Sequence, residues 1–399
     1  MTPNIRPKLL VTTSAFPRRQ GEQRDMFMLD LCRHLARTYE VFVLVPHDKG
    51  FSRKEEYEGM HIIKHPQSPF NAQRIAYGSG ILPNIRKNKL LLFAVPFYFL
   101  YQLHYIRRII RKEKIQLLNA HWLIPQGLTA VIYKRFFNRK IKLVVTVHGT
   151  DLLGLSKGLG GKLQRYVMKH CNRIITVSGA MKAILNAYGF GDKTFVRSMG
   201  IDTQQFLPAK RKPELRLKYG ITGPFLLYVG AVIEPKGIRH LVQALPSVLK
   251  QFPEARLMVV GEGNLMGEMQ QLATRLNISS SVVFTGSLPH SGLPELFASA
   301  DMFVLPSMSE GFGLVVAEAM SSGTVVIASD LPALHDLIIP QKTGFFVPAG
   351  DSVALAEQVL YVLQQQDDLL EMRREARQHI LTGFSWEVVA QEYAGLLNK

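Results

Sequence analysis

Short apolar runs alternate with longer amphipathic stretches along almost the whole chain, and this alternation constrains the fold more than any other feature. In the first half, apolar runs lie at residues 8–14, 40–45, 115–120, 141–147, 174–178 and 194–197, and residues 23–39 have a helical pattern. In the second half, they lie at residues 225–230, 256–261, 282–285, 302–305 and 324–328. Strands that alternate with helices favour parallel sheets with right-handed crossovers. The two series therefore predict an α/β protein with two doubly wound domains.

The boundary between the domains is expected near residues 200–213, where Pro208 and Pro213 flank a basic stretch. A length of 399 residues is consistent with two or three domains. Ligands of open α/β sheets bind beyond the carboxyl ends of the strands. We therefore expect the reactants to meet in a cleft between the two domains.

Composition places the chain among soluble globular proteins. Hydrophobic residues make up 47% and charged residues 20%, which excludes a disordered or collagen-like chain. The two cysteines, Cys32 and Cys171, are too few for a disulfide framework or a four-cysteine zinc site. The apolar residues 9–11 are too short for a signal-peptide core. We expect a cytoplasmic protein.

The charge is unevenly distributed along the chain. The formal net charge is +17, but residues 1–200 hold 33 Lys and Arg against 11 Asp and Glu, a net charge of +22. Residues 201–399 hold 15 against 20, a net charge of −5. A basic first half favours an anionic partner, which could be a lipid headgroup, a phosphorylated substrate or a nucleic acid. Nucleic acid is not expected, because no helix-turn-helix, ribonucleoprotein or zinc-finger pattern accompanies the charge.

Residues 90–114 combine an apolar, aromatic stretch with a basic end. The stretch LLLFAVPFYFLYQL (90–103) contains Pro96 and is shorter than the roughly 20 residues of a spanning helix, so we expect no transmembrane helix. Its basic end consists of Arg107, Arg108, Arg111, Lys112 and Lys114. One interpretation is an element that lies on an anionic membrane surface, at the inner face of the cytoplasmic membrane. The other is a core helix with a solvated basic end, and the sequence leaves both open.

The most informative segment is PSMSEGFGLVVAEAMSSG (306–323), which follows a predicted strand and opens a predicted helix. Its glycines allow close backbone approach, and amide groups at a helix N-terminus can bind anionic oxygens. Glu310 and Glu318 stand eight residues apart and can accept hydrogen bonds from a polyhydroxylated ligand. The alternative interpretation is an acid at a helix N-terminus and an ordinary surface glutamate.

This E-x7-E segment closely resembles the retaining glycosyltransferases of family 4, which have the two-domain GT-B fold. Further matches follow in the order of that family: YVGAVIEPKGIRHLVQAL (228–245), VVGEGN (259–264), VVFTGSLPHSGLPELFASADMFVLPS (282–307) and TGFFVPAGD (343–351). In the first half, TVHGTD (146–151) and SMGIDTQQF (198–206) also match. The resemblance implies an acceptor-binding domain at residues 1–205, a nucleotide-sugar domain at 206–380, and a C-terminal helix at 381–399 that packs back on the first domain.

The resemblance implies a nucleoside-diphosphate sugar, linked to UDP or GDP, as the donor. Lys236 would neutralise the departing diphosphate with help from the amides of residues 311–314. Glu310 would hold hydroxyls of the donor sugar, and Glu318 would accept from the ribose. The donor-binding set is Gly21, Gly230, Lys236, Gly261, Glu310, Gly311, Phe312, Gly313, Leu314 and Glu318. The acceptor would be a saccharide or a lipid-linked saccharide of cell-surface polysaccharide or glycolipid assembly.

In the first half, the resemblance implies catalytic and acceptor-side residues. His148 would contact the transferred sugar and so join Lys236 and Glu310 as a catalytic residue; otherwise it is a core or capping histidine. Glu22, His121, Trp122 and Asp151 form the acceptor-side set, although Trp122 could equally be core packing. The resemblance implies a front-face route, in which the acceptor attacks the sugar on the face that the diphosphate leaves. A phosphate oxygen helps to deprotonate the acceptor hydroxyl, and no carboxylate nucleophile is needed. The sequence has no Asp-x-Asp motif, so we expect no metal and no other cofactor.

Three departures from the family pattern affect the donor site. Ala231 stands where family members usually carry an arginine beside the diphosphate, and Arg239 is the nearest substitute in sequence. Arg18-Arg19-Gln20-Gly21 replaces a pair of glycines, and LPALHD (331–336) replaces a glycine-rich turn and a glutamate. A basic binding protein with a degenerate donor site therefore remains an alternative to a transferase. Because the same fold serves nucleotide-sugar epimerases, an epimerase is a second alternative, although such enzymes are not expected to show this E-x7-E setting.

Overall fold

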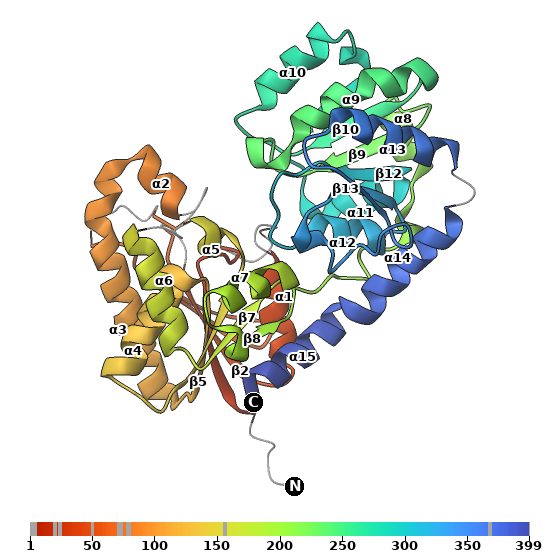
Figure 1. Ribbon diagram of the computed structural model, residues 1–399. Helices are drawn as coiled ribbons and strands as arrows, with labels where there is room; N and C mark the ends of the chain where they lie inside the picture. Colours follow the sequence, from red (N-terminus) through yellow and green to blue (C-terminus); the bar gives the residue numbers. More distant parts are fainter. Residues whose placement is uncertain are drawn as a thin grey trace. The chain divides into compact units, whose positions relative to one another are not determined.

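The computed structural model describes residues 6–18, 22, 26–48, 52–69, 75–76, 81–154, 158–365 and 369–398 (Figure 1). The chain divides into two compact units. Unit 1 comprises residues Met1–Gly200 and Val389–Lys399, and unit 2 comprises Ile201–Val388. Each unit is built around its own sheet, which confirms the prediction of two doubly wound α/β domains.

The sheet of unit 1 has the strand order β3-β4-β2-β1-β5-β6-β7-β8. The strands are β1 (Lys8–Thr12), β2 (Glu40–Pro46), β3 (Lys54–Tyr57), β4 (Met60–His65), β5 (Leu117–His121), β6 (Lys142–Val147), β7 (Arg173–Thr176) and β8 (Thr194–Val196). All neighbours are parallel except β3, which pairs antiparallel with β4. β1 and β5 are adjacent at the centre, so the loops that follow them are expected to bear a site.

The strands β3 and β4 were not expected from the sequence. They form a hairpin in which Tyr57 pairs with Met60 across a turn made by Glu58 (φ 50°) and Gly59 (φ 77°). Positive φ at both central residues is the geometry of a tight hairpin turn, and Gly59 adopts it without the steric cost that other residues incur. The strand KEEY is polar because it lies at the edge of the sheet.

The helices of unit 1 follow the strands in the expected alternation. They are α1 (Met26–Leu35), α2 (Ile81–Lys87), α3 (Val95–Glu113), α4 (Leu128–Phe136), α5 (Thr150–Gly154), α6 (Gly158–His170) and α7 (Gly179–Ala187). The 3₁₀ helix η1 (Lys89–Ala94) leads directly into α3. Pro96 stands in the first turn of α3, where a proline removes no helical hydrogen bond, and so it does not interrupt the helix.

η1 and α3 together form one helical segment, Lys89–Glu113, of 25 residues. By length and composition alone it could cross a membrane, so the segment is longer than the sequence suggested. One face of α3 nevertheless packs against unit 1. Tyr98, Gln102 and Ile106 are buried there, and the Gln102 amide donates to Thr12 Oγ1 at 3.1 Å.

The sheet of unit 2 is entirely parallel, with the order β11-β10-β9-β12-β13-β14. Its strands are β9 (Phe225–Val229), β10 (Arg256–Val260), β11 (Val282–Gly286), β12 (Met302–Leu305), β13 (Val325–Ser329) and β14 (Phe345–Val347). β14 was not expected, because it has three residues and lacks a long apolar run. The order reverses direction between β9 and β12, which is where ligands of such sheets bind.

Helices cover both faces of this sheet and explain why its central strands are buried throughout. They are α8 (Pro213–Lys218), α9 (Ile238–Gln251), α10 (Met266–Arg275), α11 (Leu293–Ser299), α12 (Leu314–Ser321), α13 (Ser352–Gln364) and α14 (Leu370–Gly383). α9, α10 and α13 share one apolar core with residues of β9 such as Leu226 and Tyr228. On the other face, Phe297 of α11 packs edge-to-face on Phe303 of β12.

The last helix, α15 (Trp386–Asn398), begins in unit 2 and belongs to unit 1 from Val389 onward. Within unit 1, the Tyr39 hydroxyl oxygen lies 3.1 Å from the Ala394 carbonyl oxygen and 2.7 Å from Asn398 Oδ1, and its one proton can be donated to either. Arg173 donates to the Leu396 carbonyl at 3.0 Å. These bonds attach the end of the chain to the first sheet.

Candidate active site

Two glycines bring the loops after β9 and β10 into close contact. The Gly230 N–H donates to the Val260 carbonyl, and the Gly261 N–H donates to the Gly286 carbonyl, both at 2.9 Å. Gly261 has φ +138°, and a Cβ there would lie 1.9 Å from the Gly230 oxygen. These sequence-predicted donor residues therefore line adjacent loop backbones, and at Gly261 a side chain does not fit.

The loop after β9 also packs against the loop after β12. A short 3₁₀ turn, η5 (Glu234–Lys236), ends at Gly237 with φ +62°, and a Cβ there would lie 1.9 Å from the Pro306 oxygen. The Met308 N–H donates to the Pro235 carbonyl at 2.9 Å. This contact carries Lys236 to Glu310, 74 residues later in the chain.

Lys236 and Glu310 form an ion pair. Lys236 Nζ lies 2.6 Å from Glu310 Oε1, and the Ser307 hydroxyl donates to the same oxygen at 2.6 Å. The Glu310 side chain is 7% exposed and that of Lys236 is 27% exposed, so the cation is the solvent-facing partner. Burial raises the pKa of Tyr228, near the end of β9, and the negative charge of Glu310 raises it further.

Residues 311–314 lead from Glu310 into α12. Gly313 caps the helix in the left-handed region with φ +88°, and a Cβ there would lie 2.5 Å from Leu334. Phe312 is buried and its ring lies 5.9 Å from that of Phe384. Phe312 therefore anchors the loop, and Leu314 begins the helix whose first amides have no carbonyl partner within it.

Glu318 lies in the second turn of α12 and is buried. His290 Nε2, from the 3₁₀ turn η7 (His290–Gly292), lies 2.9 Å from Glu318 Oε1. The His290 ring packs edge-to-face on Phe206 at 5.3 Å. The glutamate is thus oriented by a histidine that the sequence analysis did not single out.

Arg239, the nearest cation in sequence to Ala231, is engaged elsewhere. Its guanidinium is paired with Glu268 at 2.5 Å, on α10. Ala231 itself is exposed, and its carbonyl accepts from the Tyr228 hydroxyl at 2.9 Å. Of the two cations weighed for this loop, Lys236 is the one that faces Glu310.

In unit 1, His121 and His148 lie side by side after neighbouring strands. His121 ends β5 and His148 follows β6, and His121 Nδ1 lies 2.9 Å from His148 Nε2. The Trp122 ring stacks on His148 with centroids 4.4 Å apart and planes at 27°. Trp122 has φ 73°, a left-handed conformation rare for a bulky residue, which turns its ring toward His148. His121 is buried and His148 partly so.

Desolvation governs the protonation of both histidines. Burial lowers the pKa of His121 well below its ordinary value, and a second effect of the same sign comes from His148. Burial also lowers the pKa of His148. Both rings are therefore neutral at pH 7, and each carries one N–H and one lone pair.

Asp151 fastens the loops that carry these histidines. Its Oδ1 accepts from the N–H groups of His148 and Gly149 at 3.1 and 3.0 Å, and its Oδ2 accepts from the Leu123 N–H at 2.9 Å. Burial raises the pKa of Asp151, and these backbone hydrogen bonds oppose that effect. The geometry gives Asp151 a structural role, because it joins the loop after β5 to the loop after β6.

Two predicted site residues, Gly21 and Glu22, lie in the loop after β1. Glu22 is described, whereas Gly21 lies outside the described residues. Glu22 accepts from the Arg18 N–H at 2.6 Å and from its guanidinium at 2.7 Å. Arg18 also pairs with Asp48 at 3.1 Å. Glu22 is thus engaged by a cation of its own loop.

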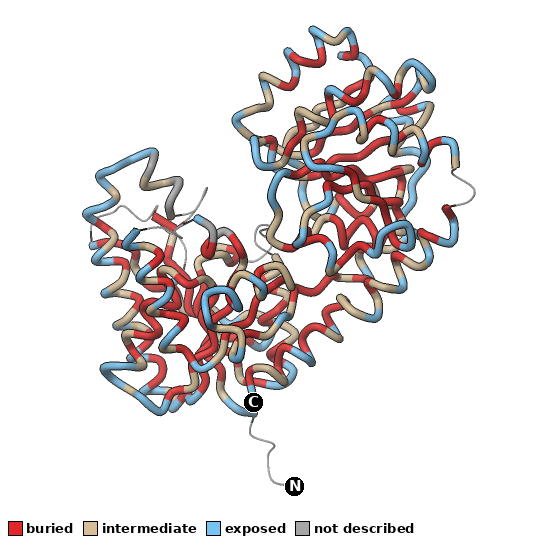
Figure 2. Tube along the Cα trace, viewed as in Figure 1, coloured by how far each residue is buried: buried red, intermediate tan, exposed pale blue. Residues whose placement is uncertain are grey.

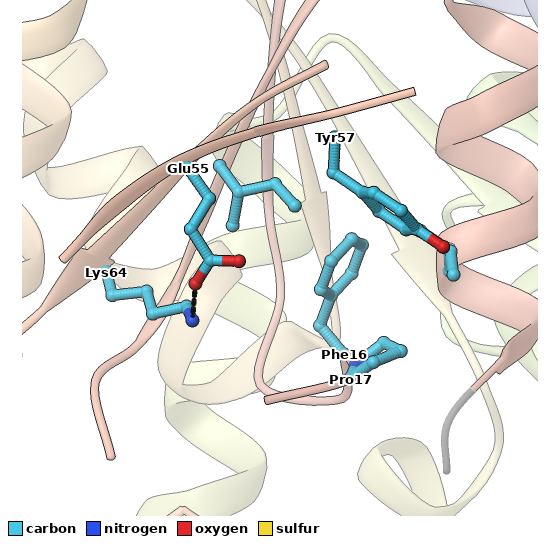
Figure 3. Close-up of a pocket in the computed structure, with 7 residues that line it drawn as sticks. Phe16, Pro17, Glu55, Tyr57 and Lys64 are labelled. Carbon is cyan, nitrogen blue, oxygen red and sulfur yellow. Dashed lines mark hydrogen bonds and ion pairs between the residues drawn. The ribbon is translucent and has the colours of Figure 1, made fainter. Parts of the chain in front are cut away.

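A small pocket in the same unit lies beneath the β3–β4 hairpin (Figure 3). It is lined by Phe16, Pro17, Leu29, Glu55, Tyr57, Ile62 and Lys64. The buried Lys64 pairs with Glu55 and donates to the Arg18 carbonyl at 2.7 Å. The pocket has a volume of about 10 Å³, which accommodates about one water molecule, so the pocket is too small to bind a sugar. Among the described residues, no three His, Cys, Asp or Glu side chains are grouped as metal ligands.

Solved structures with the same fold identify the class. Sucrose-phosphate synthase from Thermosynechococcus elongatus matches with a TM-score of 0.80 and 21% identity, over 98% of each chain. The Anabaena protein HepE in complex with UDP and glucose matches with a TM-score of 0.77 and 20% identity, over 98% of this chain and 99% of that one. The protein therefore has the GT-B fold, as expected from the sequence.

Sequence comparisons identify the family. Residues 26–205 match the description "Glycosyltransferase Family 4", and residues 212–379 match "Glycosyl transferases group 1". Glycogen synthase from Mycobacterium tuberculosis is 31% identical over 70% of this chain and 68% of its own length. A GDP-mannose-dependent phosphatidylinositol monomannoside mannosyltransferase from Mycolicibacterium smegmatis is 24% identical over 98% of each. The chain belongs to glycosyltransferase family 4, and it is a glycosyltransferase.

Four polar residues that contact the candidate residues had not been selected by sequence reasoning: Ser307 and His290 in unit 2, and Asn119 and Tyr393 in unit 1. Ser307 and His290 lie within the segment that resembles the family, but no spacing ties either to its glutamate. Asn119 stands two residues before His121 on β5, and alternation along a strand puts both side chains on one face. That alternation is a signal present in the sequence. Tyr393 comes from 272 residues further along the chain, and only the fold brings it to His121.

Proposed function

We propose that the protein transfers a sugar, with retention of configuration, from a UDP- or GDP-linked donor to a hydroxyl of a saccharide or lipid-linked saccharide. The observation that carries this proposal is the ion pair between Lys236 and Glu310, at the carboxyl ends of β9 and β12. It places a solvent-facing cation beside a nearly buried carboxylate at the switch point of a parallel sheet. A diphosphate would be bound by the cation, and the hydroxyls of the attached sugar would be bound by the carboxylate beside it.

Donor binding would exchange partners within this pair. The phosphate oxygens would take Lys236 Nζ, and Glu310, still held by Ser307, would become free to accept from sugar hydroxyls. As the anomeric C–O bond breaks, negative charge develops on the diphosphate. The amides of residues 311–314 and the Lys236 ammonium would stabilise that charge. Glu318, oriented by His290, would accept from the ribose.

Retention would follow from attack on the face that the diphosphate leaves. The acceptor oxygen forms the new bond to the anomeric carbon, and its proton passes to a phosphate oxygen of the leaving group. The product is a glycoside and a nucleoside diphosphate. No carboxylate nucleophile takes part, because Glu310 stays held by Ser307 and accepts from the sugar hydroxyls.

We propose that this chemistry needs no divalent ion, because Lys236 and the loop amides supply the positive charge at the leaving group. Transfer in excess EDTA should then proceed at the rate measured with Mg²⁺. A requirement for Mg²⁺ or Mn²⁺ that chelation abolishes and the metal restores would contradict this part of the proposal.

The acceptor is proposed to be presented at an anionic membrane surface, on the cytoplasmic side. The helical segment η1–α3 exposes the apolar side chains Leu90 (72%), Leu92 (54%), Phe93 (76%), Phe97 (37%) and Leu100 (61%). Further along α3, Arg107, Arg108 and Arg111 are also exposed. Figure 2 shows exposed stretches of α3 in pale blue. An apolar strip that continues into exposed cations suits a headgroup boundary. The M. smegmatis relative, named for a phosphatidylinositol mannoside acceptor, supports this choice.

Vesicle sedimentation tests the membrane part. We expect the protein to sediment with phosphatidylglycerol vesicles at low salt and to be released by high salt. The double variant Leu90→Ser, Phe93→Ser should bind more weakly, whereas Leu217→Ser, equally exposed in unit 2, should bind as the wild type does. Binding to neutral phosphatidylcholine that persists in high salt would contradict an electrostatic attachment.

A transfer assay tests the enzyme itself. UDP- and GDP-linked hexoses are offered with detergent-solubilised lipid-linked saccharides, and the released nucleotide is measured. The anomeric configuration of the product is read by its proton coupling in NMR. Retention is expected, and Glu310→Gln should abolish most of the release. Inverted product would contradict the proposed mechanism, and acceptor-independent nucleotide release without glycoside would contradict transfer.

A further inference from the structure

A buried chain of polar side chains leads from the last helix of unit 1 to His148. The Tyr393 hydroxyl, on α15, lies 3.0 Å from Asn119 Oδ1 on β5. Asn119 Oδ1 lies 2.8 Å from His121 Nε2, and His121 Nδ1 lies 2.9 Å from His148 Nε2. Tyr393, Asn119 and His121 are each 0% exposed.

The orientation of the Asn119 amide is assigned by its neighbours. Its Nδ2 lies 3.2 Å from the Val144 carbonyl, which can only accept, and 3.1 Å from Thr146 Oγ1. Nδ2 therefore faces β6, and Oδ1 faces the histidine. Thr146 Oγ1 also hydrogen-bonds the Tyr393 hydroxyl, and either oxygen can be the donor; with Thr146 as the donor, the tyrosine proton goes to Asn119 Oδ1.

This orientation assigns the tautomer of His121. Because Asn119 Oδ1 is an acceptor, His121 Nε2 must carry the proton that bridges them. The neutral ring then has a lone pair on Nδ1. The partner facing that lone pair is His148 Nε2, so His148 Nε2 must be the protonated nitrogen and the donor.

The same logic leaves His148 with a lone pair on Nδ1. No described residue donates a hydrogen bond to this atom. The ring is held on one side by His121 and by stacking with Trp122, and Phe27 lies 5.8 Å away. A sugar or acceptor hydroxyl is a donor that would suit this lone pair, whereas a carbonyl or carboxylate oxygen would not.

We propose that Tyr393, Asn119 and His121 are positioning residues that hold His148 as a neutral ring with its proton on Nε2, so that Nδ1 accepts a hydrogen bond from a substrate hydroxyl. The inference rests on the proposed function for the substrate, but the tautomer itself does not. It also makes α15, which begins in unit 2, a support of the reacting group in unit 1. This gives the buried network a role beyond packing.

The tautomer can be measured without substrate. Protein labelled with ¹⁵N-histidine is examined at pH 7 by long-range proton–nitrogen correlation, which distinguishes Nδ1–H, Nε2–H and charged rings. The chain has 12 histidines, and the His148 signals are those lost in His148→Gln. His148 and His121 are both expected as Nε2–H tautomers. A His148 ring protonated on Nδ1, or charged, overturns the proposal.

Variants of His121 test the support. In His121→Phe, the His148 signals should shift to a mixture of tautomers. In His121→Gln, whose amide offers a donor and an acceptor on one carbon, the Nε2–H form should persist. Tyr393→Phe removes the hydroxyl and keeps the ring; if His121→Phe fails to fold, it serves as the second variant and should broaden or shift the His121 signals. Unchanged His148 signals in a folded His121→Phe also overturn the proposal.

Kinetics then separate this proposal from the proposed function. In His121→Phe, kcat should fall by roughly 10²-fold through misplacement of His148, with donor KM unchanged and partial recovery in His121→Gln. If the wild type does not bind a nucleotide, the proposed function is contradicted but the positioning role is not. Normal kcat in His121→Phe would contradict the positioning role alone.

Discussion

Lys236 and Glu310 form an ion pair in which Nζ lies 2.6 Å from Oε1, although 74 residues separate them in the chain. The pair exists because Gly237 lets the loop after β9 approach the Pro306 carbonyl. In the absence of a ligand, the positive charge of Lys236 is thus balanced by the negative charge of Glu310. In the proposed function, a diphosphate would have to displace Glu310 from Lys236 to gain the cation.

Glu310→Gln should separate catalysis from nucleotide binding. The amide keeps the shape of the side chain and its contact with Ser307 but loses the charge that competes for Lys236. We expect kcat to fall by about 10²-fold through loss of sugar positioning. Affinity for UDP or GDP should stay the same or rise. Glu357→Gln, on the exposed side of α13, is the matched control. A parallel fall in nucleotide affinity would contradict the exchange of partners.

His290→Leu should weaken binding of the nucleoside part of the donor. Without the imidazole, Glu318 loses the group 2.9 Å from Oε1 that would orient it toward the ribose in the proposed donor site. We expect about tenfold weaker nucleotide binding, or roughly 1.4 kcal/mol, in calorimetric titration. Inorganic pyrophosphate, which has no ribose, should bind as it does to the wild type. Equal losses for nucleotide and pyrophosphate would indicate that His290 acts on the diphosphate instead.

Ala231→Arg should strengthen diphosphate binding. Ala231 is exposed two residues after the end of β9, and Arg239 is paired with Glu268, so in the proposed donor site residue 231 is the position from which a second cation would reach a phosphate. A bidentate arginine on a phosphate should tighten nucleotide binding by about tenfold, or roughly 1.4 kcal/mol. Ala231→Gln adds a polar side chain without charge and should have little effect. Equal affinity in the two variants would place the diphosphate away from residue 231.

Unit 1 should lose stability in mild acid because of His65. Desolvation lowers its pKa to about 4, opposed by the hydrogen bond to Pro66 and aided by His47. Its Nε2 is buried without a hydrogen-bond partner in the described structure. The unfolded chain binds a proton near pH 6.5 and the folded chain does not, so stability is retained above pH 6.5 and lost as the pH falls toward 4. His65 alone contributes about 1.4 kcal/mol per pH unit to this loss, and His121 and His148, whose pKa values burial also lowers, add to it.

The urea midpoint measured between pH 7 and 4.5 tests this expectation. His65→Gln should flatten the decline of unit 1, whereas His335→Gln, an exposed histidine of unit 2, should leave the curve unchanged. An identical slope in His65→Gln and wild type would assign the acid sensitivity to other groups.

The alternation of apolar and amphipathic runs predicted both sheets because parallel strands buried on two faces are continuously apolar. Residues 302–305 are the clearest case, since β12 has those bounds. The hairpin β3–β4 escaped prediction because an edge strand such as KEEY needs no apolar run. Its signal was the turn at Glu58 and Gly59, whose positive φ angles join two strands.

The candidate site was predictable where it is local in sequence and not where it depends on tertiary contacts. Glu310 and Glu318 share one strand-loop-helix segment, so their spacing showed them. The partners of these glutamates, Lys236 and His290, lie on other loops, and the ion pair itself could not be read from spacing. Tyr393 is the extreme case, because its contact with Asn119 spans 274 residues. Asp151 was assigned to the acceptor, whereas the structure shows three backbone hydrogen bonds to it.

The most direct test of the central claim is nucleotide binding to the wild type and to Lys236→Ala. Binding of UDP, GDP and ADP is measured as the shift that each causes in the thermal unfolding temperature. A nucleotide at about 100 times its Kd should stabilise the wild type by roughly 2.7 kcal/mol. We predict a shift with UDP or GDP that is strongly reduced in Lys236→Ala and kept in Lys250→Ala, an exposed lysine of α9. Equal shifts in Lys236→Ala and wild type, or no shift with any nucleotide, would contradict a donor site built on Lys236 and Glu310.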